Sequence, residues 1–154
     1  MSEKEILQKL TALCARGEHC QYEMLEKMKR WQVDEATQAN VMAYLTEHRY
    51  IDDERYARAY VNDKIKYNHW GRRKVEQGLW SKHISDNIRQ QVLDEIDDSL
   101  YLSVLRPLLQ QKRRTTRAAT DYELNQKLLK FALSRGFTYD IIRQCIDAPL
   151  DCEL

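Results

Sequence analysis

The segment VEQGLWSKHISDNIRQQV, residues 75–92, places apolar side chains at intervals of four, five and eight residues, at Val75, Leu79, Ile84 and Val92. Two other segments repeat these intervals without a gap: Met24, Met28, Val33 and Val41 in the first, and Leu128, Ala132, Phe137 and Cys145 in the third. The Ile84 position therefore recurs 51 residues earlier and 53 residues later. A period of about fifty residues indicates one structural unit used three times.

Each repeat predicts three helices joined by short turns. The first helix of the first repeat is expected to begin near Ser2, because Ser2 and Glu5 form an S-x-x-E capping box before an apolar stripe. Asp34, Ser85 and Thr138 precede the third helix of each repeat, where an N-cap residue is favoured. The short turn between the second and third helices makes each repeat similar to a helix-turn-helix.

We therefore predict an all-α protein of three tandem three-helix (helix-turn-helix-like) repeats that form an elongated, curved body. The predicted repeats cover residues 1–53, 54–98 and 99–154. Good helix formers dominate, and only four Gly and two Pro occur in 154 residues. Pro107 lies in the first helix of the third repeat and is expected to kink it. An ordinary helical bundle with the same packing is the alternative.

The composition is typical of a cytoplasmic protein. No apolar run approaches the roughly 18 residues that a membrane span needs, and the N-terminus, MSEKEILQKL, lacks the apolar core of a signal peptide. The four cysteines, at positions 14, 20, 145 and 152, form no C-x-x-C pair, so neither a metal site nor a disulfide framework is predicted. Cys14 and Cys145 fall at apolar-periodic positions, where small buried side chains are expected.

No group of residues in the sequence points to catalysis. Asp52 and Asp53 form the one carboxylate pair in a motif-like context, but neighbours on a helix point in different directions, so capping the next helix is the simpler role. The four histidines show no ligand spacing, and no glycine-rich phosphate loop is present. We predict a protein that is not an enzyme, with no catalytic residues, no cofactor and no metal.

Positive charge accumulates toward the C-terminal end of the sequence. The three predicted repeats carry net charges of −3, +1 and +3, and the windows 64–75 and 99–120 contain no acidic residue. Clustered cations can neutralise phosphates or an acidic protein surface, and aromatic side chains can stack on bases. The candidate binding residues are Lys64, Lys66, Trp70, Arg72, Arg73, Lys74, Arg113, Arg114 and Arg117.

The two basic windows are open to different interpretations. In the first, the cations either contact a partner or solvate helix faces, and Trp70 either lies at an interface or anchors neighbouring repeats. In the second, Arg113, Arg114 and Arg117 fall in a predicted connection, residues 112–120, which has no packing reason to be basic. Binding is therefore favoured for the second window.

The repeats and three short motifs resemble the RecX family. IDDERYA, residues 51–57, is similar to the family's junction, in which two aspartates precede an aromatic–alanine pair. WGRRKV, residues 70–75, resembles its glycine–basic run, and FALSRGF, residues 131–137, resembles its arginine–glycine–phenylalanine signature. The resemblance covers roughly residues 5–147. Cys20 departs from the pattern, because a Ser-like capping box with Glu23 is usual there, so a weaker cap is expected.

This resemblance implies three tandem three-helix units that lie along the groove of the RecA nucleoprotein filament. Such a regulatory protein would chiefly inhibit RecA polymerisation, ATP turnover and strand exchange, in recombination, DNA repair and the SOS response. The implied partners are the RecA filament and single- or double-stranded DNA, and several weak contacts along one repeat-built body would add by multivalency. Repeats supply their own neighbours, which favours a monomer.

Two other classes of function fit parts of the sequence. A helix-turn-helix DNA-binding protein acting independently of RecA would need Asn, Gln or Arg along an exposed third helix, where Gln38, Asn40, Asn87, Arg89 and Gln90 occur. A salt series on duplex DNA without RecA distinguishes this function. A helical scaffold with no link to nucleic acid is favoured if both basic windows prove dispensable. An enzyme ranks last.

Overall fold

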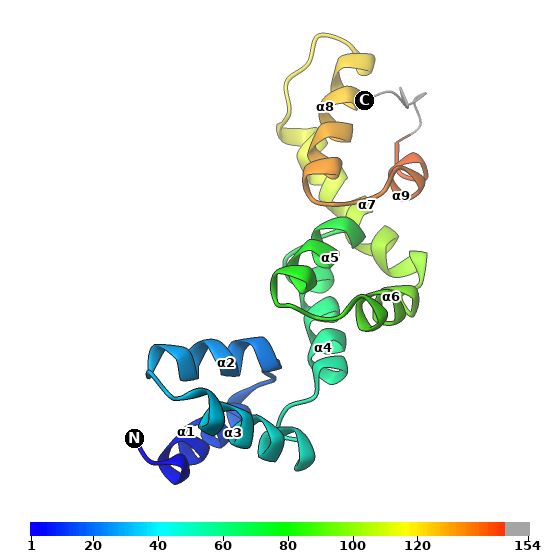
Figure 1. Cartoon of the computed structure of the whole chain (residues 1–154). Helices are drawn as coiled ribbons and strands as arrows, with labels where there is room; N and C mark the ends of the chain where they lie inside the picture. Colours follow the sequence, from blue (N-terminus) through cyan, green and yellow to red (C-terminus); the bar gives the residue numbers. More distant parts are fainter. Residues whose placement is uncertain (147–154) are drawn as a thin grey trace. The chain divides into compact units, whose positions relative to one another are not determined.

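The computed structural model describes residues 1–146, which form nine helices and no strand (Figure 1). The predicted all-α class is confirmed for this range. The helices are α1 (Glu3–Arg16), α2 (Gln21–Arg30), α3 (Glu35–Glu47), α4 (Asp53–Lys66), α5 (Arg72–Ser81), α6 (Asp86–Asp94), α7 (Asp98–Thr115), α8 (Asp121–Ser134) and α9 (Tyr139–Arg143). None of these helices combines the length and the apolar character that crossing a membrane requires.

The chain divides into two compact units. Unit 1 comprises residues 1–60 and 79–92, and unit 2 comprises residues 61–78 and the described residues from 93 on. The dividing points fall inside α4, α5 and α6, so each of these helices contributes residues to both units. The predicted repeat boundaries after residues 53 and 98 stay predictions, as does the elongated, curved shape.

The first three helices enclose the core of unit 1. α3 packs against both α1 and α2, and the side chains of Leu10, Met24 and Leu45 are completely buried. Burying each such side chain contributes about 1.5–3 kcal/mol. The other buried members of this cluster are Ile6, Met28, Val41 and Ile51.

The core of unit 2 forms where α7 packs against α8 and α9. Leu105, Leu128 and Phe137 are buried there, so the periodic positions of the third repeat lie inside as predicted. One periodic position differs: Cys145 lies beyond the end of α9 and is only half-buried. The third helix of this repeat is short and ends before Cys145, so the expectation of a buried side chain at this periodic position was wrong.

The turns after α2, α5 and α8 share one geometry. The backbone N–H groups of Val33, Ile84 and Phe137 each donate to the carbonyl oxygen five residues earlier, at 3.0, 3.2 and 3.2 Å. The residue before each donor has a positive φ, and these residues are Gln32, His83 and Gly136. This arrangement satisfies carbonyl groups that a helix end leaves without partners. It also explains the five-residue interval that all three sequence segments share.

The predicted N-caps are observed, with one exception. Ser2 and Asp34 accept hydrogen bonds from backbone N–H groups three residues later, at 3.2 and 3.1 Å. Thr120 caps α8 in the same way, at 3.1 Å. Ser85 accepts a longer one, of 3.4 Å, from Ile88. Thr138 occupies the N-cap position of α9, but its side chain accepts no capping hydrogen bond. α7 runs through Pro107 as one helix.

The cysteines were only partly predicted. Cys14, Cys20 and Cys145 are free thiols, and burial raises the pKa of each. Cys20 is completely buried, whereas Cys14 and Cys145, which were expected to be buried, are half-buried. Cys152 lies outside the described residues.

Candidate cationic binding surface

The first basic window spans the end of α4 and the start of α5. Trp70 is half-buried, and two ammonium groups lie over its indole ring, with Lys64 Nζ 5.1 Å and Lys74 Nζ 5.0 Å from the ring centroid. Cations at this distance are attracted by the ring's electron density. Within unit 2, therefore, Trp70 orients two of the predicted binding cations.

The remaining cations of this window differ in how they are held. Arg72 Nη2 contacts Asp94 Oδ1 at 2.7 Å, and Arg72 Nη1 donates to the Leu93 carbonyl at 3.4 Å. Arg73 and Lys66 are exposed, and neither side chain has a hydrogen-bond or ion-pair partner within residues 1–146. Arg72 therefore has a structural role as well, whereas Arg73 and Lys66 are available to a partner.

Gly71 lies in a backbone contact between two segments of unit 2. The start of α5, residues 71–74, contacts the turn after α8, residues 135–137, and we call this contact the second junction. The N–H of Gly71 donates to the Arg135 carbonyl at 2.8 Å, and the N–H of Arg73 donates to the Gly136 carbonyl at 3.0 Å. A Cβ on Gly71 would lie 2.3 Å from the Phe137 nitrogen. The WGRRKV and FALSRGF motifs thus meet in one structural contact.

The predicted connection in the second basic window, residues 112–120, is partly helical. α7 extends to Thr115, so Arg113 and Arg114 lie in its last turn and not in a connection. Cations are favoured at a helix C-terminus, where the carbonyl groups concentrate partial negative charge. This gives the two arginines a local reason to be basic, which weakens the sequence argument for binding. Arg117 does lie in the connection between α7 and α8.

The three candidate arginines of the second window are exposed. Arg113 Nη2 donates to Asn125 Oδ1 at 3.2 Å. Arg114 and Arg117 have no hydrogen-bond or ion-pair partner for their side chains in the described part of the chain. These guanidinium groups can therefore form bidentate contacts with phosphates or carboxylates without first breaking an internal ion pair.

Phe131 on α8 and Arg135 in the turn that follows it connect the two windows. The Arg135 guanidinium donates to the Asn68 carbonyl at 3.2 Å and lies 5.4 Å from the Phe131 ring centroid. Lys112 Nζ lies 4.9 Å from the same ring. A continuous series of contacts therefore runs from the loop before α5 to the end of α7. The sequence offered no sign of this link, because Arg135 and Asn68 lie 67 residues apart.

Both basic windows fall within unit 2. The described residues of this unit hold 14 Lys and Arg against 9 Asp and Glu, whereas unit 1 holds 11 against 12. The charge gradient along the sequence thus becomes a difference between two compact bodies. A cationic surface of this kind attracts an anionic partner and orients it during encounter.

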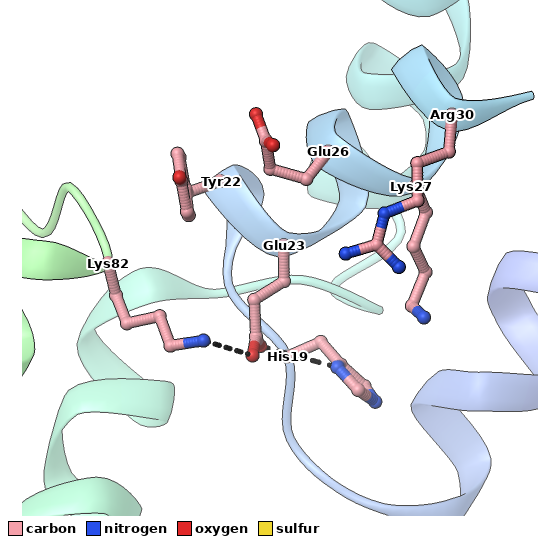
Figure 2. A pocket seen from close by; sticks show the side chains of 7 residues that line it. All are labelled: His19, Tyr22, Glu23, Glu26, Lys27, Arg30 and Lys82. Atoms are coloured by element: carbon pink, nitrogen blue, oxygen red, sulfur yellow. Dashed lines mark hydrogen bonds and ion pairs between the residues drawn. The ribbon is translucent and has the colours of Figure 1, made fainter. Parts of the chain in front are cut away.

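Unit 1 contains the polar counterpart of the second junction. In this first junction, the start of α2, residues 20–23, contacts the turn after α5, residues 82–84. Glu23 accepts from Lys82 Nζ at 3.1 Å and from the Cys20 N–H at 3.2 Å, and it pairs with His19 Nδ1 at 3.3 Å (Figure 2). Burial lowers the pKa of Lys82, but the hydrogen bond and charge of Glu23 outweigh it and raise that pKa.

The carboxylate pair has a capping role, and only one of the two residues caps the helix predicted. Asp52 Oδ1 accepts from the N–H groups of Glu54 and Arg55 at 3.0 and 3.1 Å, at the start of α4. Asp53 Oδ1 instead accepts from the Gln21 N–H at 2.9 Å, so it caps α2. Burial raises the pKa of Asp53. No group of three or more His, Cys, Asp or Glu side chains within residues 1–146 is arranged to hold a metal ion.

The fold and this surface define a class: a helical-repeat protein with a cationic unit suited to binding. Comparisons with known proteins identify the family. The model of the second three-helix domain of RecX matches residues 52–93, and the model of the third matches residues 100–146. The chain belongs to the RecX family, whose members are regulatory proteins and not enzymes.

Relatives in several bacteria support this membership. The chain is 30% identical over 135 residues to the regulatory protein RecX of Acinetobacter baylyi, covering 88% of this chain and 82% of the relative. It is 31% identical over 123 residues to that of Clostridium botulinum strain Eklund 17B, covering 79% of this chain. The match spans only 57% of the length of that clostridial protein.

Solved structures confirm the fold. The crystal structure of RecX from Lactobacillus salivarius superposes with a TM-score of 0.83 at 21% identity, covering 94% of each chain. A second crystal structure of a regulatory protein RecX superposes with a TM-score of 0.85 at 18% identity, covering 95% of this chain and 73% of the other.

Proposed function

We propose that this chain binds the RecA nucleoprotein filament through unit 2 and chiefly inhibits RecA polymerisation, ATP turnover and strand exchange. Family membership supports the regulatory role. The observation that carries the contact site is the gathering of both basic windows, with the connecting Arg135, in one unit that holds an excess of positive charge. The proposed contact residues are Lys64, Lys66, Trp70, Arg72, Arg73, Lys74, Arg113, Arg114 and Arg117.

The filament is the partner that this surface fits best, because it presents phosphates and acidic protein side chains together. Exposed guanidinium groups bind either one, so Arg73 and Arg114 can contact DNA or RecA. Lys64 and Lys74 are held on the Trp70 ring, which reduces the conformational entropy they lose on binding. Single- or double-stranded DNA is thus a second proposed contact within the same complex, and the protein acts as a monomer.

The test is inhibition of the DNA-dependent ATPase of RecA. A triple variant, Arg113→Ala, Arg114→Ala and Arg117→Ala, should need roughly tenfold more protein for half-inhibition, because up to three charge-assisted contacts are lost. Its helicity should be unchanged, because these side chains are exposed. The matched control replaces three cations of unit 1, Lys4, Arg16 and Lys29, by Ala and should inhibit like the wild type.

Equal inhibition by the triple variant and the wild type would eliminate the second window as a contact site. A variant of the first window, Lys66→Ala with Arg73→Ala, then tests the remaining part of the surface. Neither side chain has an internal hydrogen bond or ion pair within residues 1–146, so a change in inhibition reports on binding and not on folding.

A helix-turn-helix DNA-binding protein acting without RecA is not favoured. Gln38 of α3 donates its side-chain amide to the Val33 carbonyl at 2.8 Å, and Arg89 of α6 is held by the Ile84 carbonyl and by Asp86. α9 has only five residues. Side chains bound to their own backbone are poorly placed to contact base edges in a major groove. Weak duplex binding without sequence preference, in the absence of RecA, is the expected result.

A further inference from the structure

Unit 1 has a polar cleft that the filament proposal does not use. Its cavity has a volume of about 250 Å³ and lies beside α2, and Lys27, Arg30 and His19 line it together with Glu23 and Glu26 (Figure 2). Lys27 and Arg30 belong to the last turn of α2 and extend toward the same side as the His19 ring. Neither cationic side chain has a hydrogen-bond or ion-pair partner within residues 1–146.

The two acidic residues of the cleft already have partners. Glu23 accepts hydrogen bonds from the Lys82 ammonium group and the Cys20 N–H, and it lies 3.3 Å from His19 Nδ1. Glu26 lies 3.6 Å from Lys29 Nζ, on the same helix. The groups that remain to be satisfied are therefore cationic, which makes the cleft suited to a single anionic group such as a phosphate.

Aromatic side chains continue from this cleft onto the turn after α5. Tyr22, which lines the cleft, stacks on His83 with ring centroids 4.0 Å apart and an interplanar angle of 19°. His83 also lines a second hollow of about 430 Å³, beside Trp80 and Arg89. Trp80 is 68% exposed, which is unusual for the largest apolar side chain.

We infer that this face of unit 1 binds a single strand of nucleic acid, with a phosphate between Lys27 and Arg30 and an unpaired base on Trp80. Cations that follow the backbone, together with aromatic rings that stack on bases, are the features by which proteins hold single strands. An acidic protein segment would use the cations but would leave the exposed indole without a matching group. The inference does not rest on filament binding, because the strand is bound by this chain alone.

The near-neutral charge of unit 1 limits how strongly salt affects this binding. Two phosphate contacts, through Lys27 and Arg30, predict a slope of about −1.4 when the logarithm of the association constant is plotted against that of salt concentration, at roughly 0.7 per contact on single strands. A binding site on the more cationic unit 2 would give a steeper slope.

The experiment measures fluorescence anisotropy of a labelled oligothymidylate of about 15 nucleotides, titrated with the full chain at low salt without RecA. Trp80→Ala should weaken binding roughly tenfold through the loss of stacking, and Trp80→Phe should restore most of it. The double variant Lys27→Ala with Arg30→Ala should weaken binding and reduce the salt slope to near zero. Controls are Tyr44→Ala, an exposed aromatic residue on α3, and Lys4→Ala with Arg16→Ala, all of which should bind like the wild type.

Absence of oligonucleotide binding, or binding that is unchanged in both the Trp80→Ala and the cation variants, would overturn the inference. It would also be overturned if the unit 1 variants weakened only the inhibition of RecA, because the face would then contact protein. Loss of oligonucleotide binding in the Arg113, Arg114 and Arg117 triple variant alone would place the strand on unit 2. The first and last of these outcomes leave the RecA proposal standing, since inhibition is measured separately, whereas weakened inhibition in the unit 1 variants would place a RecA contact outside unit 2. Circular dichroism confirms that every variant is folded.

Discussion

The first and second junctions occupy equivalent places in the repeat, but they are built by different chemistry. Each joins the start of a repeat's middle helix to the turn after the middle helix of the next repeat. In the second junction, the N–H of Gly71 donates directly to the Arg135 carbonyl. In the first, Cys20 stands 51 residues before Gly71, and its thiol donates to the Lys82 carbonyl at 3.8 Å.

This difference separates what the repeat requires from what it tolerates. The turn geometry is the same in both, because Ile84 and Phe137 each donate to the carbonyl five residues earlier. The contact with the start of the helix differs between the two junctions. Side chains, including the Glu23 carboxylate, make it in unit 1, whereas backbone hydrogen bonds make it in unit 2. The second junction should therefore be sensitive to added atoms, and the first to pH and salt.

Gly136→Ala is expected to have the largest effect. Gly136 has a φ of 91°, and an added Cβ would lie 2.5 Å from the Lys74 Cβ. Left-handed strain of roughly 1–2 kcal/mol adds to overpacking of roughly 1–3 kcal/mol, so the free energy of unfolding should fall by about 3 kcal/mol. Urea denaturation followed by circular dichroism measures this change. Gly17→Ala is the matched control, because a Cβ added there would meet nothing within 4 Å and the φ of Gly17 is extended.

If Gly136→Ala and Gly17→Ala proved equally mild, the second junction would not depend on close backbone approach. Hydrogen exchange refines the result, because loss of protection should be concentrated at the Gly71 and Arg73 amides, which donate across this junction.

Alkaline pH should weaken the first junction. Burial raises the pKa of the Cys20 thiol to about 11 from an ordinary value of 9.0. Below pH 9 the thiol is neutral in both states. Between pH 9 and 11 the unfolded chain ionises while the folded chain keeps the neutral thiol. The free energy of unfolding should therefore fall as pH rises, by roughly 2 kcal/mol from this group.

Cys20→Ala isolates this contribution. The variant is less stable than the wild type near neutral pH, because it leaves a small cavity. The difference between the two proteins should shrink as the pH rises from 9 to 11, because only the wild type carries this thiol. Groups whose raised pKa does not depend on Cys20, such as Tyr101, are common to both proteins and cancel in the comparison. A difference that stays constant over this interval contradicts the prediction.

Removing the charge of Glu23 should have a smaller effect on the first junction. Glu23→Gln keeps the shape of the side chain but removes its ion pair with Lys82, which is partly exposed. The free energy of unfolding should fall by about 1 kcal/mol at low salt and by less at high salt. Glu26→Gln, whose partner Lys29 lies 3.6 Å away on the same helix, is the control and should change stability by less than about 0.5 kcal/mol. A Glu23→Gln effect that is independent of salt would mean that shape, not charge, maintains the junction.

The sequence predicted the elements of these junctions but not their pairing. The apolar intervals around Ile84 indicated which side chains are buried, and the five-residue interval reflected a turn with a defined hydrogen bond. Periodicity carries no information on which residues of different repeats meet. It therefore gave no indication that Gly71 contacts Arg135 or that Cys20 contacts Lys82.

For the candidate binding surface, too, the sequence indicated the residues but not the contacts that they make. A run of basic letters looks uniform, yet Arg72 is paired with Asp94 while Arg73 points to solvent, because successive helical positions face different directions. Arg135 was overlooked as a contact residue because its link to Asn68 joins positions 67 residues apart. Counting charged residues along the sequence locates the basic segments, but only the folded structure shows which of their side chains are available to a partner.

The smallest expected effect concerns the turns. Gln32 and His83 adopt φ values of 57°, whereas the equivalent residue of the third repeat is Gly136. Glycine adopts this conformation without strain, so Gln32→Gly should raise the free energy of unfolding by about 0.5–1 kcal/mol. His83→Gly makes the turn of the first junction resemble that of the second, but it also removes the stacking on Tyr22. Its gain should therefore be smaller than that of Gln32→Gly. Thermal denaturation of the two variants measures this order, and an equal gain would mean that the Tyr22–His83 stack contributes nothing to folding. In that case, the function of the His83 imidazole in this strained turn would be binding and not stabilisation of the fold.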